Sequence, residues 1–356
     1  MRTGKLPPEL LARLLKKIPR SDPRVLVAGS VGEDAAALDF AAEHDHLSPG
    51  HPEDRILVAK TDPVTFATDS AGWYAVHVNA NDVACAGAVP RWFMASALLP
   101  ETWEESDVER LFDQIVEACA SLGVSLIGGH TEVTGGIDRP LIAGTMLGEV
   151  ERRRLVRTGG GKPGDALVLT QGIAIEGTSV LAREAADALR RQGVPAETIE
   201  RAQGLLFDPG ISVVRAARLV CEAVPAAALH SLHDPTEGGL ATGLWELAEA
   251  SGCGAVVDEA AVPVLAETRA VCDALGIDAW GLLASGSLLA AVAAEQAGVA
   301  VGALQALGIG AAVIGELREA GEGLMLRRGD GGRAAWPSFD RDEVARYFDE
   351  LRAAGG

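Results

Sequence analysis

Acidic and amide side chains gather in four short segments between Val25 and Glu132. They lie at residues 31–36 (VGEDAA), 60–63 (KTDP), 79–82 (NAND) and 128–132 (GGHTE). Small residues in or beside each segment let the backbone approach a ligand closely, and the side-chain oxygens can then point into one space. Carboxylates that meet in this way repel one another unless a cation neutralises them. Because oxygen ligands without a Cys or His cluster favour magnesium over zinc, the segments predict a site for magnesium and a nucleotide.

Short apolar runs predict the strands that must position these segments, and two longer stretches predict helices. The expected strands cover residues 25–27, 35–40, 55–60, 92–99, 124–127 and 141–150, and the expected helices cover 70–87 and 106–122. On this pattern residues 60–63 form a turn, and Gly128 and Gly129 end a buried strand. The helix to Leu122 should be capped by residues 106–107 and should bury a stripe that includes Phe112 and Val116. The order of elements predicts an α+β domain in which helices cover one sheet.

Two regions near the N-terminus carry further candidates. Residues 10–18 have the apolar spacing of a helix that follows two prolines. Residues 41–54 hold three histidines, two prolines and four acids, a composition that predicts an exposed loop. Its histidines, His44, His46 and His51, could also bind a metal, although their spacing fixes no geometry.

A change of composition marks a domain boundary. The basic run at residues 151–154 (ERRR) precedes the glycine-rich segment 159–164, so we expect the boundary near residues 151–155. The expected domains are residues 1–152 and 153–356. The arginines between them could meet phosphate or form a solvated linker.

The second half contains two segments that could bind an anion or simply start helices. A strand at residues 166–170, a glycine loop and a helix from Thr178 form a possible anion cradle, although no Gly-Lys-Ser/Thr of a P-loop follows. Residues 230–240 (HSLHDPTEGGL) open another helix, which Asp234 or Thr236 could cap. Residues 184–201 form a charged helical stretch, and residues 341–356 an amphipathic helix.

Length and composition exclude several classes of protein. With 356 residues, 48% of them hydrophobic and 23% charged, the chain is expected to form two globular domains. Its net charge of -19 argues against a nucleic-acid partner, because phosphate backbones are bound by basic surfaces. The five cysteines lack C-x-x-C spacing, which predicts buried thiols rather than a zinc ribbon. Neither a membrane span nor a signal peptide is predicted, so a cytoplasmic location is expected.

Five segments, in their order along the chain, resemble the motifs of one family. They are residues 32–36 (GEDAA), 81–90 (NDVACAGAVP), 128–132 (GGHTE), 234–240 (DPTEGGL) and 284–286 (ASG). Through them the chain resembles the aminoimidazole ribonucleotide (AIR) synthetase superfamily, which includes thiamine-monophosphate kinase, selenophosphate synthetase and the hydrogenase-maturation protein HypE. The resemblance covers nearly the whole chain and is strongest to HypE-like proteins.

The resemblance implies a two-domain AIR-synthetase-like fold of the α+β (α/β) class. The mixed sheet of the N-terminal domain would pair with that of a second copy, forming a barrel across a homodimer, and the C-terminal domain would be α+β. ATP and Mg2+ would be bound near the dimer interface, and the substrate would be a small molecule.

The resemblance also implies roles for individual residues. Metal or phosphate would be held by Asp34, Asp62, Asp82 and Asp234, and catalysis would involve Asp82, His130 and Glu132. The nucleotide would contact Lys60, Asn81, Gly128, Gly129, Thr131, Asp234, Thr236 and Gly238. For Lys60 the alternative is an ordinary surface lysine at the end of a strand.

Some positions depart from the family patterns. Residue 130 is His where kinase-like and HypE-like members often carry an acid, and Glu132 could compensate. HypE proteins end in a cysteine that accepts a carbamoyl group, whereas the last cysteine here is Cys272, which argues against carbamoyl chemistry. No cysteine precedes Cys85, where selenophosphate synthetases carry a reactive one near the N-terminus. Thiamine-phosphate kinases have a double aspartate where residues 33–34 are Glu-Asp.

Three hypotheses on function follow from the resemblance. In the first, the protein is an ATP- and Mg2+-dependent enzyme that activates an oxygen of a small substrate by phosphoryl transfer. In the second, it is a small-molecule kinase. In the third, it is a nucleotide-binding regulatory dimer without turnover, an idea motivated by His130 and the missing terminal thiol.

Overall fold

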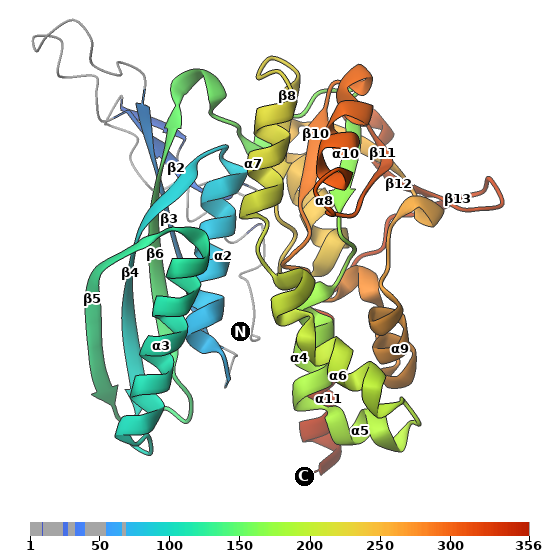
Figure 1. Ribbon diagram of the computed structural model, residues 1–356. Coiled ribbons are helices and arrows are strands. Elements are labelled where there is room, and N and C mark those ends of the chain that lie inside the picture. Colours follow the sequence, from blue (N-terminus) through green and yellow to red (C-terminus); the bar gives the residue numbers. More distant parts are fainter. Residues whose placement is uncertain (1–8, 10–23, 28–32, 40–54, 66–68, 356) are drawn as a thin grey trace, which may run out of the picture. The chain divides into compact units, whose positions relative to one another are not determined.

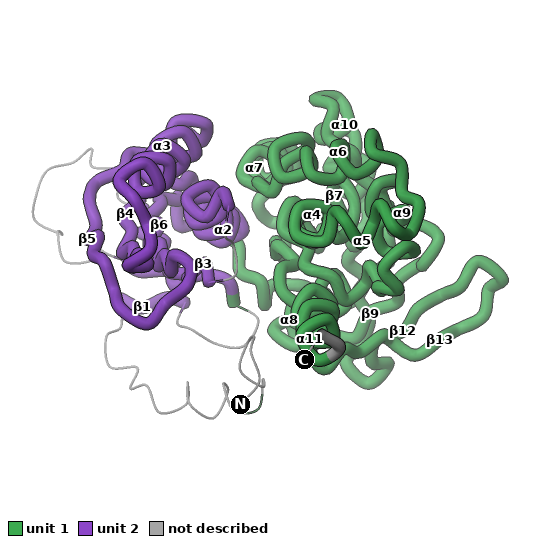
Figure 2. The backbone as a smooth tube through the Cα atoms, turned by 90° about the horizontal axis from the view of Figure 1, so that it is seen from below, with its two compact units in different colours: residues 1–19, 30–33, 156–356 green, residues 20–29, 34–155 purple. Residues whose placement is uncertain are grey.

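The computed structural model describes residues 9, 24–27, 33–39, 55–65 and 69–355. The chain divides into two compact units, which are coloured separately in Figure 2. Unit 1 contains Glu33 and the chain from Val156 onward, and unit 2 contains Asp34 to Leu155 together with the first strand. We describe each unit by itself. The helix expected at residues 10–18 and the histidine-containing loop expected at 41–54 lie outside the described residues.

Unit 2 is built on a six-stranded mixed sheet with the order β1-β2-β3-β6-β4-β5 (Figure 1). The strands are β1 (Val25–Val27), β2 (Ala36–Leu38), β3 (Arg55–Val64), β4 (Val89–Pro100), β5 (Ser125–Thr134) and β6 (Leu141–Glu151). Neighbouring strands are antiparallel, apart from β4 and β5, which are parallel. The chain passes from β4 to β5 through a helix, as a parallel connection requires.

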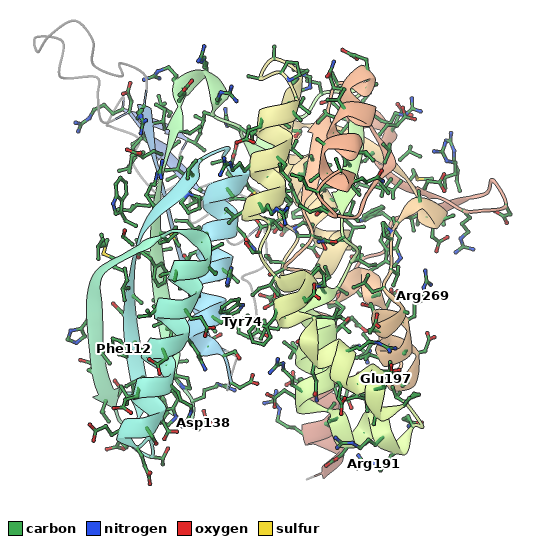
Figure 3. The ribbon with its side chains drawn as sticks, viewed as in Figure 1. Tyr74, Phe112, Asp138, Arg191, Glu197 and Arg269 are labelled. Carbon is green, nitrogen blue, oxygen red and sulfur yellow. The ribbon has the colours of Figure 1, made fainter. Side chains whose placement is uncertain are left out.

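Two helices, α2 (Ala71–Cys85) and α3 (Glu105–Leu122), cover one face of this sheet (Figure 1). α2 is rich in small residues and is buried along most of its length, so its polar side chains are held in fixed surroundings. Tyr74 on α2 is 1% exposed, whereas Phe112 on α3 is 41% exposed (Figure 3). The expectation that Phe112 and Val116 belong to the buried stripe of α3 is therefore wrong, because α3 forms the outer layer and buries mainly Leu111, Ile115 and Cys119.

Close packing of α2 on β6 depends on two glycines. A Cβ atom at Gly144 would lie 2.5 Å from Asn79 Nδ2, and one at Gly148 would lie 2.4 Å from Val83 Cγ1. These distances are far below van der Waals contact, so a larger residue at either position would push the helix away from the sheet. The glycines thereby hold the polar face of α2 against β3 and β6.

Two segments predicted as turns or strand ends lie inside strands. β3 continues through Thr61, Asp62 and Pro63, so these residues do not form a turn. β5 continues through Gly128 and Gly129 and is exposed along almost its whole length, because it is the edge strand of the sheet. Glycine at position 129 serves the strand pairing, since a Cβ atom there would lie 2.0 Å from Ala95 O of β4.

Unit 1 contains a seven-stranded sheet with the order β13-β12-β9-β11-β7-β10-β8. The strands are β7 (Ala166–Thr170), β8 (Leu229–His233), β9 (Cys253–Asp258), β10 (Leu289–Val292), β11 (Ala311–Glu319), β12 (Leu324–Arg327) and β13 (Arg333–Ala335). Among the described strands of this sheet, only β12 and β9 form a parallel pair. All five residues of β7 are buried, so both faces of the central sheet are covered.

Helices provide that cover. They are α4 (Ile175–Glu184), α5 (Ala186–Arg191), α6 (Ala196–Gly204), α7 (Val214–Ala223), α8 (Gly239–Ser251), α9 (Ala266–Leu275), α10 (Ala297–Gln305) and α11 (Glu343–Gly355). One apolar core joins Leu167 and Leu169 of β7 to Leu181 of α4, Leu244 of α8 and Val271 of α9. Among the described residues, no helix combines the length and the apolar character that crossing a membrane would need.

Expectations for this half are largely confirmed, with two corrections. The strand at residues 166–170 is β7, and the C-terminal amphipathic helix is α11. However, α4 begins at Ile175, before the expected start at Thr178, because Ala174 with a positive φ already ends the preceding loop. Residues 184–201 also form two separate helices, interrupted near Gly193, rather than one.

Candidate functional site

Two of the predicted metal ligands meet at one lysine in unit 2. The Nζ atom of Lys60 lies 3.2 Å from Asp82 Oδ2 and 3.5 Å from Asp62 Oδ2. The side chain of Asp62 is 47% exposed, that of Lys60 20% and that of Asp82 only 9%. Two carboxylates from different elements are therefore held together, and a single ammonium group lies between them.

β3 and α2 bring these three side chains together. Lys60 and Asp62 are two residues apart on a strand, so their side chains leave the same face of the sheet. α2 packs across β3, and Asp82 in its last turns reaches this face. The neighbour on the opposite face, Thr61, donates a hydrogen bond from Oγ1 to Gly144 O over 2.7 Å and so ties β3 to β6 at the same level.

Asn79 holds the backbone of Asp62 in place, a role that the sequence analysis missed. The amide N–H of Asp62 donates to Asn79 Oδ1 over 2.8 Å. In return, Asn79 Nδ2 donates to Asp62 O over 3.2 Å and to Ala75 O over 2.8 Å. Asn79 is fully buried, its bond to Ala75 O is buried, and its two bonds to Asp62 are partly buried. Its position three residues before Asp82, on nearly the same side of a helix, is the signal that could have revealed it.

Two other predicted residues of unit 2 are Asn81 and Asp34. Asn81 is fully buried on α2, next to Asp82. Asp34 is half-buried, and its carboxylate lies within 4.8 Å of the Sγ atom of Cys85 at the end of α2. Cys85 is a buried free thiol, as the sequence predicts.

The predicted residues of the GGHTE segment lie on the edge strand β5. β6 and β4 lie between β5 and β3 in the sheet. At the usual spacing of neighbouring strands, β5 with His130 and Glu132 therefore lies roughly 14 Å from β3, which carries Asp62. His130 Nε2 lies 3.1 Å from Glu132 Oε2, and the two side chains are 67% and 53% exposed. Gly128, Gly129 and Thr131 lie on the same exposed strand. Within one copy of unit 2, these residues are not brought to Lys60.

In unit 1, the predicted residues Asp234, Thr236 and Gly238 form the connection from β8 to α8. Asp234 is buried, and the N-cap of α8 is Gly238, with a φ of 84°. The expectation that Asp234 or Thr236 caps this helix is wrong, because the N-cap residue is Gly238. Instead, the amide of Gly238 donates to Asp342 Oδ2 over 2.7 Å. The capping carboxylate thus comes from a residue about a hundred positions later in the chain.

Three segments of unit 1 lie side by side. Two of them, the DPTEGG turn and the ASG turn, are family motifs, and the third is the start of α4. The carbonyl of Thr236 accepts hydrogen bonds from Gly239 N over 3.0 Å and from Ala284 N over 3.2 Å. The carbonyl of Leu283 accepts one from Gly177 N over 2.8 Å. The start of α4, the DPTEGG turn and the ASG turn are therefore joined by backbone hydrogen bonds.

The fold and these segments are those of one family. Residues 32–150 match the family model described as AIR synthase related protein, N-terminal domain, and residues 162–326 match its C-terminal domain. The chain belongs to the AIR synthase related family. This confirms the resemblance drawn from the sequence and the two-part α+β fold that it implied.

Similar proteins include several hydrogenase-maturation enzymes. Carbamoyl dehydratase HypE of Cupriavidus necator is 33% identical over 297 residues, which cover 80% of this chain and 80% of the relative. The HypE of Escherichia coli is 30% identical over 295 residues, covering 81% of each.

Solved structures with a similar fold include two HypE structures and a kinase. A HypE in complex with ATP has a TM-score of 0.68 and 26% identity and covers 91% of this chain and 92% of that one. The HypE of E. coli has a TM-score of 0.71 at 24% identity and covers 95% of this chain and 99% of that one. Thiamine monophosphate kinase of Aquifex aeolicus has a TM-score of 0.62 at 20% identity and covers 79% of this chain and 90% of that one. The last two likenesses establish the fold alone.

Proposed function

We propose that the protein is an ATP- and Mg2+-dependent enzyme that activates an oxygen of a small substrate by phosphoryl transfer. The observation that carries the proposal is the group formed by Lys60, Asp62 and Asp82. Two carboxylates beside one ammonium group provide oxygen ligands of the kind that Mg2+ prefers, together with a cation that can meet phosphate. The likeness to a HypE structure in complex with ATP supports the same assignment.

Lys60 has two possible partners in this proposal. Without nucleotide, its ammonium group neutralises Asp62 and Asp82. Asp62 and Asp82 would hold Mg2+, and Lys60 could then meet the phosphate oxygens as a point charge. Positioning and charge neutralisation supply most of the catalysis in phosphoryl transfer, so a rigid support for these groups matters. Asn79 provides that support through its bonds to the backbone of Asp62.

Roles in the same reaction are proposed for other predicted residues. Asp34 and Asp234 are proposed as further ligands of Mg2+ or contacts of phosphate, and Asn81, Thr236 and Gly238 as nucleotide contacts. His130 and Glu132 are proposed to act in catalysis from the β5 strand of a second copy.

A homodimer is proposed because the edge of the unit 2 sheet is open and apolar. β5 has no neighbour on its outer side among the described strands, and Leu126, Ile127 and Val133 on it are exposed. A long exposed edge strand of this kind is a template for pairing with another chain. Pairing two such edges would cover these side chains and bring the GGHTE segments into an assembled site.

The direct test measures binding and product together. We expect ATP with Mg2+ to raise the melting temperature of the wild-type protein and the shift to be lost in Asp82→Asn. Asp113→Asn, an exposed acid on α3, is the matched control and should keep the shift. Absence of any shift in the wild type with ATP or ADP would contradict the proposal.

Phosphorus NMR on candidate substrates then distinguishes the reactions. Free phosphate with a dehydrated or cyclised product indicates a synthetase, whereas phosphate retained on the product indicates a kinase. Nucleotide binding without turnover across a broad substrate panel would instead indicate a regulatory dimer.

A further inference from the structure

A short hairpin in unit 1 carries three arginines that the proposed reaction does not use. β12 and β13 form this hairpin, and Figure 1 shows it extending away from the rest of the unit. Arg327, Arg328 and Arg333 are all exposed on it. Of the three, only Arg327 forms an ion pair with a described residue, since its Nε atom lies 3.7 Å from Asp258 Oδ2 of β9. The hairpin is therefore a local basic surface on a chain whose net charge is -19.

Two of these arginines face each other across the hairpin. The register pairs Arg327 with Arg333, and Arg328 N donates to Gly332 O over 2.8 Å in the next pair toward the tip. At the tip, the amide of Gly332 donates to Asp330 Oδ1 over 2.8 Å. Hydrogen-bonded and non-hydrogen-bonded pairs alternate along antiparallel strands, so Arg327 and Arg333 form a non-hydrogen-bonded pair, in which side chains are closest. Because like charges directly opposite each other are destabilising, this pair favours an anionic partner.

The same alternation shows which backbone groups of β13 are open. Ala334 and Leu326 form a hydrogen-bonded pair, so the N–H and C=O groups of Arg333 and Ala335 point away from β12. β13 is the edge strand of its sheet, and no group in the described part of the chain bonds to these outward-pointing groups. Open donors and acceptors along an edge are a template for a further strand.

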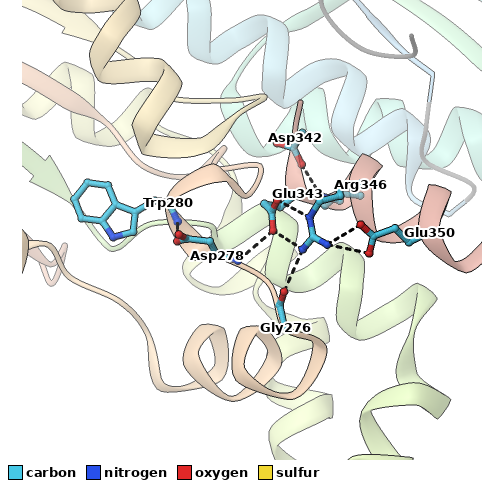
Figure 4. A network of polar contacts seen from close by, with 8 residues as sticks. Gly276, Asp278, Trp280, Asp342, Glu343, Arg346 and Glu350 are labelled. Atoms are coloured by element: carbon cyan, nitrogen blue, oxygen red, sulfur yellow. Dashed lines mark hydrogen bonds and ion pairs between the residues drawn. The ribbon is translucent and has the colours of Figure 1, made fainter. Parts of the chain in front are cut away.

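This edge is firmly held on unit 1. Trp336, directly after β13, donates from Nε1 to Ala241 O of α8 over 2.9 Å, and its ring packs edge to face on Trp280 with centroids 5.7 Å apart. Trp280 N donates in turn to Asp278 Oδ1 over 2.9 Å, and Asp278 N donates to Glu343 Oε2 over 3.2 Å (Figure 4). A strand that docks on β13 therefore meets a surface that is already formed, which lowers the cost of binding.

We propose that the open edge of β13 binds an extended acidic segment of a partner protein as an additional strand. Main-chain hydrogen bonds to Arg333 and Ala335 provide the pairing, and carboxylates on alternate residues of the segment meet Arg327 and Arg333. A peptide offers both donors and acceptors to the outward-pointing groups, whereas a DNA backbone offers only acceptors. This surface is separate from the residues of the proposed phosphoryl transfer.

The alternative is that the arginines protect an exposed edge from pairing, as charged side chains on edge strands often do. β13 has only three residues, and short edge strands serve the same protection. The two cases differ in whether an acidic strand binds at this edge at all.

The test is fluorescence anisotropy of a labelled short peptide of alternating Glu and Val, titrated with the full chain at low salt. We expect this peptide to bind, and a peptide of alternating Glu and Pro, which has the same charge but cannot pair as a strand, to bind about tenfold more weakly or less.

Two variants separate the backbone from the charge. Ala335→Pro removes an outward-pointing N–H and leaves the bonds to β12 in place, and Arg333→Glu reverses one charge. Each should weaken binding of the Glu-Val peptide by about tenfold. Arg190→Glu, at an exposed arginine on α5, is the matched control and should bind this peptide as the wild type does.

Each outcome decides the proposal. Binding that both variants weaken supports it. No binding of the Glu-Val peptide, or equal binding by the wild type and either variant, overturns it, and so does tighter binding of a single-stranded DNA of equal charge. If Ala335→Pro does not fold, the two peptides on the wild type make the same decision, because equal binding of both would exclude strand pairing.

Discussion

Lys60 and Asp82 form an ion pair of 3.2 Å in which the carboxylate is almost fully removed from water. A buried pair of this kind adds little net stability, because taking both charges out of water opposes their attraction. Its value lies in holding two charges close together that a ligand can then separate.

Replacing Lys60 by Met should destabilise the protein, because Asp82 and Asp62 would lose the ammonium group that lies between them. We expect the free energy of unfolding to fall by about 1–3 kcal/mol, less than for a fully buried pair because Lys60 is partly exposed. Mg2+ should restore part of this loss. Urea unfolding with and without Mg2+ measures both effects, and Lys162→Met is the matched control. A variant as stable as the wild type in both conditions would exclude this coupling.

Asn79→Ala should be more costly than the loss of an ordinary side-chain bond. It leaves the amide and the carbonyl of Asp62 without the Asn79 side chain in a partly buried place, at up to about 1–3 kcal/mol for each unsatisfied group. Gln114→Ala, which removes one bond to Gly72 N, should cost less. Nucleotide-induced melting shifts should also decrease in Asn79→Ala, since Asp62 is no longer held. Equal stability of the two variants would argue against the role of Asn79.

Gly144→Ala tests the close packing of α2 on the sheet. The added Cβ atom would lie 2.5 Å from Asn79 Nδ2 and 2.8 Å from Phe93 Cε2, so we expect a loss of about 1–3 kcal/mol. Gly298→Ala lies in a helix with open space around it and should instead stabilise the protein by roughly 0.5–1 kcal/mol. Thermal unfolding of the two variants measures the contrast.

His77 should make stability depend on pH. It is buried on α2, and burial lowers its pKa from 6.5 to about 4. Because the folded state keeps this ring neutral, the stability it contributes is complete above pH 6.5 and is lost as the pH falls toward 4. Removing the histidine should recover an amount of order 3 kcal/mol near pH 4. Unfolding of His77→Leu across this range, with exposed His130→Leu as control, gives the difference, and parallel pH profiles of His77→Leu and the wild type would contradict it.

Charged substitutions on the edge strand test the proposed dimer. Val133→Lys, at an exposed position of β5, should weaken self-association, since a charge there opposes both apolar contact and edge pairing. Val299→Lys changes another exposed valine, on α10, and should leave association unchanged. Sedimentation velocity separates the two results. A wild-type protein that stays monomeric at micromolar concentration would contradict the dimer itself.

Local sequence patterns predicted the helices and most strands of unit 2 well. They failed where glycine or proline was interpreted as the end of a strand. α2 was expected at residues 70–87 and lies at Ala71–Cys85. In contrast, β3 runs through Pro63 and β5 through Gly128 and Gly129. Glycine at 129 is required by the approach of Ala95 on β4, a contact between separate strands that no local pattern contains.

The candidate site was predictable only in part, because local patterns do not contain the contacts between separate elements. The family resemblance implies Asp62 and Asp82 as metal or phosphate ligands, and the structure joins them through Lys60. Asn79 lay inside a recognised segment, but its bonds to Asp62 depend on how α2 packs on β3. Asp342 lies far along the chain from the DPTEGG turn and carried no motif, so only the tertiary fold could reveal its bond to Gly238.

We propose that Asp62 and Asp82 hold Mg2+ while Lys60 meets phosphate. A crystal structure with Mg2+ and a non-hydrolysable ATP analogue tests this most directly. We expect Mg2+ at about 2.1 Å from oxygens of both carboxylates and Lys60 Nζ turned to a phosphate oxygen. Ordered phosphates that lie away from all three residues, with the Lys60–Asp82 ion pair unchanged, would contradict it.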